Sequence, residues 1–540
     1  MNSPDAVKGA ARSRGQVFRY EGFAVDAERG LLTCRYSLDG REFAERVTLA
    51  PGPGWDTPAA RAAARLVYLL AGVSYYKTAA PPVIDLGDTA LTERELAFLR
   101  EFYLSGLGEY AYRNGLDLSD LAFRSSPAPI AGECAVGVAT ATPTAHSYAL
   151  PPAPAASGAS GNATAPASTA PTAAPVPAAP VPAAPVPAAP VPALAPGNAA
   201  APAAPASPPA GAVPAPASDL RPLIPFGGGI DSIVTVEGVR QRTADIALFV
   251  VNRPGDRFAA IERPAAVSGL EILRAGREID PQLLRSQELG FLNGHVPVTG
   301  IISAIAVLAA VLNDRNAVVM SNEWSASVPT LEHNGQQVNH QWSKSAAFEA
   351  SFRELLKADP AGLPDYFSAL RDRTELWVGE RFANLTQYHG TFRSCNRAFH
   401  IDTRRRLDHW CGQCDKCCFI DLILAPFMPA EQLRAVFAPD GAGNASGNPE
   451  PLDNPELKPK FQTLLGSGTK PFECVGEVNE CRAAVVLAAS RQDRRDTTLL
   501  RELAADVSRR PDAPTEAEIE AMRHPVGASF VPAGYSFVEP

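Results

Sequence analysis

The stretch Leu223-Ile224-Pro225-Phe226-Gly227-Gly228-Gly229-Ile230-Asp231-Ser232 decides the fold of the second half of the chain. A short apolar strand ends in three consecutive glycines, and Asp231 and Ser232 then open a helix that runs to Arg240. Glycines let the backbone approach a phosphate closely, and the free amides and the dipole at a helix start attract an anion. A triple glycine alone is typical of a flexible turn, but its place between strand and helix predicts a phosphate-binding loop at residues 227–232.

The loop does not fit two common nucleotide-binding patterns. The Walker pattern ends in Gly-Lys-Ser or Gly-Lys-Thr, whereas this stretch has no lysine, and the dinucleotide fingerprint spaces its glycines. The loop resembles instead the Ser-Gly-Gly-x-Asp-Ser loop of the ATP-pyrophosphatase (PP-loop) superfamily, which splits ATP into AMP and pyrophosphate. Gly227 replaces the first serine of that loop, so one hydroxyl donor is missing. The resemblance implies that pyrophosphate, escorted by Mg²⁺, is held by Gly227, Gly228, Gly229, Asp231 and Ser232.

Strand-like and helical runs alternate downstream of the loop, which is typical of a parallel α/β sheet. Strands are expected at 246–251 and 317–320, and helices at 299–312 and 345–356. Parallel sheets bind ligands beyond the carboxyl ends of their strands. Polar side chains at those positions are therefore candidates to line a nucleotide site, although each alone could be a cap or turn residue; they are Asn252, Thr299, Asn322 and Glu323.

A cysteine cluster indicates a metal site. Five of the nine cysteines fall within residues 395–418, and two Cys-x-x-Cys steps share Cys414. Four thiolates form a closed tetrahedral zinc site, and the predicted ligands are Cys395, Cys411, Cys414 and Cys417, with Cys418 as a spare thiol. A redox dithiol and simple core packing are the rival interpretations. The spacing resembles the zinc knuckle of another PP-loop enzyme, 7-cyano-7-deazaguanine synthase, in which a zinc of this kind is structural.

The composition divides the chain into three parts. Residues 126–218 are mostly Ala, Pro, Ser, Thr and Gly, with Pro-Val-Pro-Ala-Ala repeats, and such a segment cannot bury enough apolar surface to fold. We predict a disordered linker there, for which a role as a ligand of Pro-binding modules is an alternative. Residues 1–125 are expected to form a small α+β domain, and residues 219–540 the PP-loop domain.

Charge and hydropathy exclude some classes of protein. The net charge of −9 over 540 residues argues against a nucleic-acid-binding protein, which would be basic. Neither a signal peptide nor a run of about 18 apolar residues is visible, so no membrane association is expected. Clustered rather than evenly spaced cysteines agree with a reducing compartment. The sequence predicts a cytoplasmic protein of undetermined oligomeric state.

The whole set of motifs resembles the UDP-N-acetyl-alpha-D-muramoyl-L-alanyl-L-glutamate epimerase family of peptidoglycan synthesis. Two of the matching stretches are Gly-Val-Ser-Tyr-Tyr-Lys at 72–77 and Gly-Leu-Gly-Glu-Tyr-Ala-Tyr-Arg-Asn-Gly-Leu-Asp at 106–117. The matching blocks cover 71–117, 226–232, 321–325, 339–345, 394–418 and 472–481.

The resemblance implies a small-molecule substrate, a UDP-activated muramoyl dipeptide, whose terminal L-Glu is adenylated by ATP and inverted to D-Glu. A base would remove the α-proton and an acid would return one. His340, Lys344 and Glu323 are the candidates for this acid–base pair, and Cys418 is a further candidate if it binds no metal.

Three other functions stay open. Another PP-loop synthetase or amidotransferase would pass the adenylate to ammonia, but no glutaminase-like segment is evident. A tRNA-modifying enzyme fits poorly with the acidic charge. A non-catalytic scaffold would only bind ATP on its altered loop.

Overall fold

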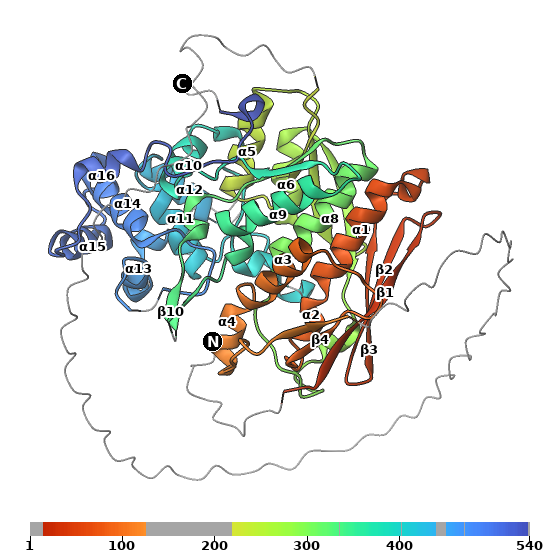
Figure 1. The fold of residues 1–540 in the computed structure, drawn as a ribbon. Helices are drawn as coiled ribbons and strands as arrows, with labels where there is room; N and C mark the ends of the chain where they lie inside the picture. Colours follow the sequence, from red (N-terminus) through yellow and green to blue (C-terminus); the bar gives the residue numbers. More distant parts are fainter. Residues whose placement is uncertain are drawn as a thin grey trace, which may run out of the picture. The chain divides into compact units, whose positions relative to one another are not determined.

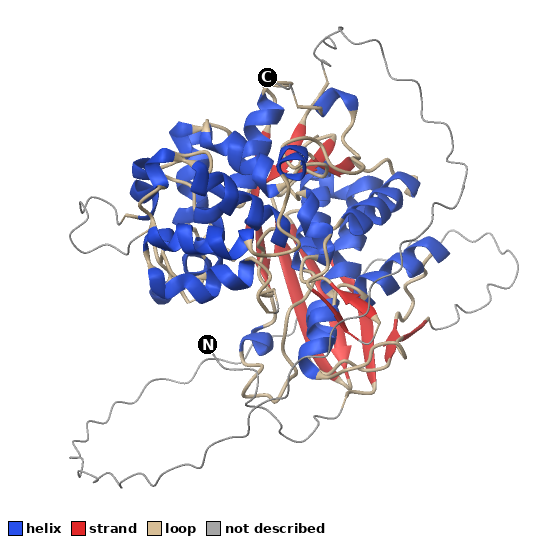
Figure 2. Cartoon of the chain, turned by 90° about the vertical axis from the view of Figure 1, so that its left-hand side faces the viewer, coloured by secondary structure: helices blue, strands red, loops and turns tan. Residues whose placement is uncertain are grey.

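The computed structural model describes residues 14–125, 219–333, 335–400, 402–438, 450–468 and 470–537 (Figure 1). The predicted linker at 126–218 lies outside the described residues. The expected α/β class is confirmed, because helices cover a large, mostly parallel sheet (Figure 2).

One ten-stranded sheet has the order β12-β9-β6-β7-β8-β3-β2-β1-β4-β5. Its first five strands are parallel. From β6 the chain runs outward through β7 and β8, then returns to the other side of β6 for β9 and β12, so the strand order reverses between β6 and β9. These strands are β6 (Pro222–Pro225), β7 (Ala247–Asn252), β8 (Glu271–Glu278), β9 (Ala317–Met320) and β12 (Asp365–Ser368).

The N-terminal strands extend this same sheet. The chain begins with an antiparallel pair, β1 (Val17–Asp26) and β2 (Leu31–Leu38), and β3 (Arg41–Thr48) pairs antiparallel with β2. Strand β3 then pairs antiparallel with β8, with Arg46 opposite Glu278. The short strands β4 (Val83–Asp85) and β5 (Ala122–Arg124) complete the edge beside β1.

Alternating side chains send two hydrophobic cores to opposite faces of the sheet. In β6, Leu223 belongs to one core and Ile224 to the other, and Val318 and Val319 of β9 divide in the same way. Both faces of these strands are therefore covered, as parallel sheets require. On the Leu223 face lie α1 (Pro58–Ala71), α3 (Glu93–Leu104), α8 (Val298–Leu312) and α9 (Ala346–Ala358).

The Ile224 face carries the longer series of helices, many of them from the C-terminal third of the chain. They are α5 (Ile230–Arg240), α6 (Ala259–Ser268), α10 (Glu375–Ala383), α11 (Asp415–Leu424), α12 (Ala430–Phe437), α13 (Lys458–Leu464), α14 (Val478–Ser490), α15 (Thr498–Ser508) and α16 (Glu516–Ala521). The remaining short elements are α2 (Val73–Tyr76), α4 (Gly108–Asn114), α7 (Pro281–Leu284) and the hairpin β10 (Leu331–His333) and β11 (Gln336–Val338).

Within the described ranges, none of the helices has both the length and the apolar character needed to cross a bilayer.

Candidate functional site

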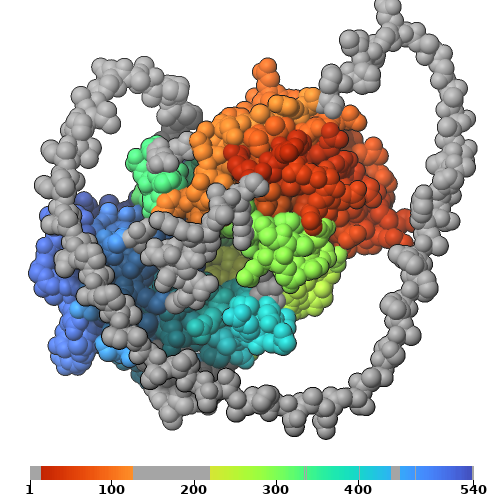
Figure 3. Space-filling model, turned by 90° about the horizontal axis from the view of Figure 1, so that it is seen from below, coloured from red at the N-terminus to blue at the C-terminus, as the bar shows by residue number. Residues whose placement is uncertain are grey.

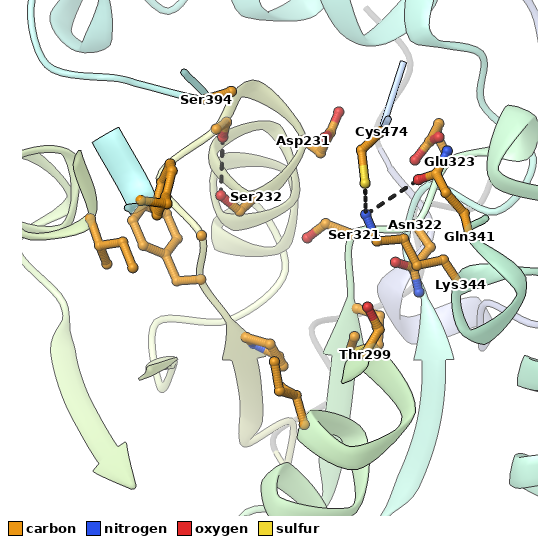
Figure 4. A pocket seen from close by; sticks show the side chains of 18 of the residues that line it. Asp231, Ser232, Thr299, Ser321, Asn322, Glu323, Gln341, Lys344, Ser394 and Cys474 are labelled. Carbon is orange, nitrogen blue, oxygen red and sulfur yellow. Dashed lines mark hydrogen bonds between the residues drawn. The ribbon is translucent and has the colours of Figure 1, made fainter. Parts of the chain in front are cut away.

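A pocket of about 380 Å³ lies at the carboxyl ends of β6, β7 and β9, where the strand order reverses (Figure 4). Open parallel sheets place their ligands at this switch point, because the connections diverge there and leave a crevice. Loop residues form one wall, the end of β9 forms another, and later segments close the pocket. The polar lining side chains include Asp231, Ser232, Thr299, Ser321, Asn322, Glu323, Gln341, Lys344, Glu375, Ser394, Lys416 and Cys474.

The three glycines of the loop meet different constraints. Gly228 has φ of +75°, and a Cβ built there would lie 2.1 Å from the carbonyl oxygen of Ala260, so only glycine fits. A Cβ on Gly229 would lie 2.8 Å from Ser394 Oγ, whereas one on Gly227 would meet nothing within 4 Å. Gly227 and Gly229 line the pocket directly. Gly228 therefore makes a turn that only glycine allows, and Gly227 and Gly229 leave the loop backbone accessible from the pocket.

Helix α5 starts directly after the glycines. Gly229 is its N-cap, so Asp231 lies in the first turn, where helix amides have no partner within the helix. Ser232 Oγ donates a hydrogen bond to the carbonyl of Gly229 at 3.0 Å. The expected arrangement of glycines, acid and hydroxyl at a helix start is present, and it is suited to an anion.

Three carboxylates meet beside the loop. Asp231, Glu323 and Glu375 each offer an oxygen, and these oxygens lie within 4.8 Å of one another. Among the described residues, Asp231 Oδ1 and Glu375 Oε2 are buried without a hydrogen-bond partner. Burial, and then repulsion by Glu323, raises the pKa of Asp231 to about 6, and burial raises that of Glu375 well above its usual value. A divalent cation would satisfy these oxygens, so the group fits Mg²⁺.

Cys474 faces several cationic side chains. Lys344 Nζ donates to Cys474 Sγ at 3.3 Å and to Gln341 Oε1 at 3.3 Å (Figure 4). Lys416 Nζ donates to the main-chain carbonyl of Cys474. Burial alone would raise the pKa of the Cys474 thiol, but Lys344, His340 and Lys416 lower it to about 6. A cysteine in these surroundings is a thiolate at neutral pH.

His340 lies behind Cys474 and connects the pocket to the N-terminal part of the chain. Its Nδ1 is hydrogen-bonded to Glu109 of α4, and its ring centroid lies 4.3 Å from that of His295. Burial lowers the pKa of His340, but its hydrogen bonds with Cys474 and Glu109 outweigh this and raise it to about 9. Burial lowers the pKa of His295 to about 4, so the two rings carry different charges near neutral pH.

The remaining nucleotide-site candidates divide between two pockets. Thr299, at the start of α8, and Asn322, after β9, line the central pocket. Asn252 lies instead in a neighbouring pocket of about 670 Å³, which shares Val251 and Ile302 with the central one. The side chain of Asn252 donates to the carbonyl of Asp256 at 3.0 Å, so it stabilises the turn after β7.

The four predicted zinc ligands converge outside the pocket. The Sγ atoms of Cys395, Cys411, Cys414 and Cys417 lie within 4.8 Å of one another. The Sγ–Sγ distances are 3.6 Å between Cys411 and Cys417 and 3.4 Å between Cys414 and Cys417. Tetrahedral zinc with bonds of about 2.3 Å places its sulfurs roughly 3.8 Å apart, so the set fits zinc. Cys418, in α11, is buried in the hydrophobic core, and this burial raises the pKa of its thiol.

Sequence reasoning missed several of the converging residues. Cys474 and Glu375 reach the pocket from segments that carry no spacing motif, and Glu109 comes from a helix far upstream. Lys416 lies inside the cysteine motif, but the zinc prediction gave it no role. Three of them carried a signal that the sequence offered: Cys474, Lys416 and Glu109 fall inside the blocks 472–481, 394–418 and 71–117 that carry the family resemblance.

The fold and site together define an α/β protein with a glycine-rich loop and a pocket at the switch point of a parallel sheet. The model of the MurL N-terminal domain matches residues 10–144 and 194–369, and that of the MurL C-terminal domain matches residues 391–518. No solved structure matches the chain.

Curated relatives agree with these models. A protein of Xanthomonas oryzae pv. oryzae is 32% identical over 96% of this chain and 95% of its own length. Proteins of Salinispora tropica and a Micromonospora species are each 34% identical, over 97% and 91% of this chain and 95% and 90% of their own lengths. All three are named UDP-N-acetyl-alpha-D-muramoyl-L-alanyl-L-glutamate epimerase. The chain therefore belongs to this epimerase family.

Proposed function

We propose that this protein epimerises the terminal L-Glu of UDP-N-acetylmuramoyl-L-alanyl-L-glutamate to D-Glu in peptidoglycan synthesis, and that it splits ATP into AMP and pyrophosphate to do so. The names of its relatives support the substrate and the inversion. One observation supports the use of ATP: the glycine loop, the start of α5 and the unpaired carboxylate oxygens of Asp231 and Glu375 face one pocket.

Adenylation has a clear physical purpose in this reaction. Removing an α-proton beside an ionised carboxylate builds a second negative charge next to the first. An acyl-adenylate removes the first charge and makes the carbonyl electron-withdrawing, so the α-proton becomes acidic. Water then cleaves the adenylate and releases AMP and the D-Glu product.

The chain's residues divide the work as follows. The amides of Gly227, Gly228 and Gly229 and the hydroxyl of Ser232 bind the departing pyrophosphate. Asp231, Glu323 and Glu375 would hold Mg²⁺, which would neutralise the triphosphate charge. Thr299 and Asn322 orient the nucleotide from the opposite wall.

Proton transfer belongs to the side of the pocket that holds Lys344 and Glu323. Lys344 lines the pocket. Burial lowers the pKa of its ammonium group, but the negative charges of Cys474 and Glu323 raise that pKa by more, so Lys344 stays protonated. His340 does not line the pocket and acts through its neighbours. The four cysteines would hold a structural zinc that fixes the start of α11, from which Lys416 reaches the pocket.

A single incubation tests the proposal. Purified protein is mixed with ATP, Mg²⁺ and UDP-N-acetylmuramoyl-L-alanyl-L-glutamate, AMP is measured by chromatography, and glutamate configuration is measured by chiral analysis after hydrolysis. AMP together with D-Glu is the expected result. Asp231→Asn should abolish both products, whereas Asp245→Asn, at an exposed position paired with Arg315, should not. If AMP forms without D-Glu, the proposed substrate is wrong. If folded protein forms neither AMP nor D-Glu, the proposed activity is wrong.

A further inference from the structure

Cys474 has the surroundings of a reactive thiolate inside the proposed catalytic pocket. Its Sγ lies 3.3 Å from Lys344 Nζ, and its main-chain carbonyl is fixed by Lys416. Figure 4 shows the Cys474 side chain pointing toward Lys344, with Asp231 and Glu323 nearby in the pocket. The thiol therefore lines the same pocket as the glycine loop on which we propose that ATP is split.

We propose that Cys474 is a catalytic residue whose thiolate removes the α-proton of the adenylated glutamate, and that Lys344 and His340 are positioning residues that keep it deprotonated. The proposal rests on the proposed function and deepens it, because it assigns the base of the inversion.

The proton and electron balance is simple. The Cys474 thiolate takes the α-proton and becomes a neutral thiol. The electron pair of the broken C–H bond passes to the α-carbon and is delocalised onto the adenylated carbonyl, so the centre becomes planar. A proton that originates from water is then added to the opposite face, and the thiol returns its own proton to solvent. No oxidant or reductant takes part.

The neighbours of Cys474 are poorly suited to be the base themselves. Lys344 is charged, and a charged amine cannot accept a proton. His340 uses Nδ1 to bond Glu109, and its pKa of about 9 keeps it charged at neutral pH. Lys416 is bonded to a main-chain carbonyl. Cys418, the thiol singled out from the sequence, is buried away from the pocket.

The charges around Cys474 explain how a thiolate persists there. Lys344, from the segment before α9, His340, from the preceding loop, and Lys416, from α11, face it with positive charge. Asp231, from α5, faces it with negative charge, and a cation bound there would offset this charge. Glu109 of α4 contributes indirectly, because it holds His340 in its protonated form.

The first test separates proton abstraction from adenylation. Cys474→Ser is compared with wild type in two assays: substrate-dependent exchange of labelled pyrophosphate into ATP, and incorporation of deuterium from D₂O at the glutamate α-carbon. We expect α-deuteration and D-Glu formation to fall by about 100-fold or more, the scale of a lost general base, while pyrophosphate exchange changes by less than about threefold. Cys34→Ala, at a buried thiol in β2, is the matched control and should change neither.

Four results would overturn the proposal. Full α-deuteration in Cys474→Ser would show that another group is the base. Equal loss of both activities would assign the thiol a structural role. A thioester between Cys474 and the substrate, detected by intact-protein mass spectrometry, would make it a nucleophile instead. Absence of pyrophosphate exchange in wild type would remove the proposed function and this inference with it.

A second test examines the positioning residues without relying on activity. The rate of Cys474 alkylation by iodoacetamide, followed by peptide mass spectrometry, reports the thiolate fraction. In wild type this rate should rise with pH around 6. Lys344→Met removes the positive charge that donates to Cys474 Sγ, so the rise should move upward by about one pH unit or more. An unchanged profile would overturn the role given to Lys344.

Discussion

Asp231 illustrates how a single buried carboxyl couples the stability of the fold to pH. Its pKa in the folded protein, about 6, lies above the ordinary 3.8, mainly because burial disfavours the charged form. The protonated carboxyl therefore contributes stability that is fully present below pH 3.8 and is lost as the pH rises through about 6. The Mg²⁺ that we propose to bind here would offset this penalty by compensating the charge.

We predict that Asp231→Asn raises the Tm of the metal-free protein at pH 7.5 by about 2–4 °C and leaves it nearly unchanged at pH 4. Added Mg²⁺ should raise the Tm of wild type at pH 7.5 but have a much smaller effect on the variant. Differential scanning fluorimetry across this pH range measures both. A variant less stable than wild type at pH 7.5 without metal would contradict the prediction.

The glycine loop provides a second prediction at this scale. Gly228→Ala forces a Cβ against the carbonyl of Ala260 and a left-handed backbone on alanine, which should cost about 1–3 kcal/mol and displace the loop. Gly227→Ser restores the hydroxyl of the PP-loop pattern in open space and should fold normally.

Thermal unfolding and the KM for ATP in the pyrophosphate exchange assay distinguish the two variants. Gly228→Ala should lose at least about tenfold in kcat/KM, and Gly227→Ser should keep or improve it. An intact loop in Gly228→Ala would show that the turn does not require glycine.

The residues that sequence could not predict share one property: they meet only through the fold. Cys474 and Lys344 are separated by 130 positions, and Glu109 and His340 by 231. The loop at 227–232 and the cysteine pattern at 411–417 were predictable, because each is a local motif whose chemistry depends on neighbours in sequence. The group of three carboxylates was predictable in part: Asp231 and Glu323 lie at recognisable strand ends, whereas Glu375 does not.

Element boundaries followed from local chemistry. At the start of α3, Thr92 and Glu95 have the spacing of a capping box and form both of its bonds. Glu95 N donates to Thr92 Oγ1 at 3.2 Å, and Thr92 N donates to Glu95 Oε2 at 2.8 Å. Strand β9 begins and ends at the predicted residues. Strand β8 was not predicted, because its polar sequence and half-buried side chains lack an apolar run.

Helix α11 leads to a prediction about metal removal. Cys414 is its N-cap residue, and two of the next residues, Lys416 and Cys417, reach the pocket and the cysteine cluster. We expect one zinc ion per chain by plasma mass spectrometry, and its removal by a chelator should lower both the Tm and the activity.

Cys414→Ser should lose the zinc, whereas Cys418→Ala should retain it, because its thiol is directed into the core. Metal-free protein with full activity, or a Cys414→Ser variant that keeps its zinc, would contradict the structural role.

Across the whole molecule, the N-terminal part and the loop-bearing part share a sheet, and Glu109 of the N-terminal part contacts His340 behind the pocket. Lys77 Nζ donates to Asn293 Oδ1 at 2.9 Å and to the carbonyl of Gly294 at 3.1 Å, and Figure 3 shows the red and orange N-terminal part beside the green segment around residue 300. The two were distinguishable in sequence because residues 126–218 separate them, but the pairing of β3 with β8 depends on contacts that no local pattern reports.

The junction of β3 and β8 leads to a prediction for the whole molecule. Glu45 is fully buried there, and it accepts from Arg277 Nε at 2.8 Å and from the Tyr75 hydroxyl at 3.0 Å. Glu45→Gln leaves the Arg277 charge buried without its partner, which typically costs about 3–5 kcal/mol. Because the strands belong to one sheet, calorimetry should show a single unfolding transition that moves to lower temperature as a unit.

Glu42→Gln, on the exposed side of the same strand, is the matched control and should leave that transition in place. The activity of Glu45→Gln should fall at temperatures where the wild type is still folded, because Glu109 reaches His340 only while the N-terminal strands are docked. Two separate transitions, with only the earlier one shifted by Glu45→Gln, would show instead that the N-terminal part unfolds on its own. Activity that persists above that first transition would then show that catalysis does not need Glu109.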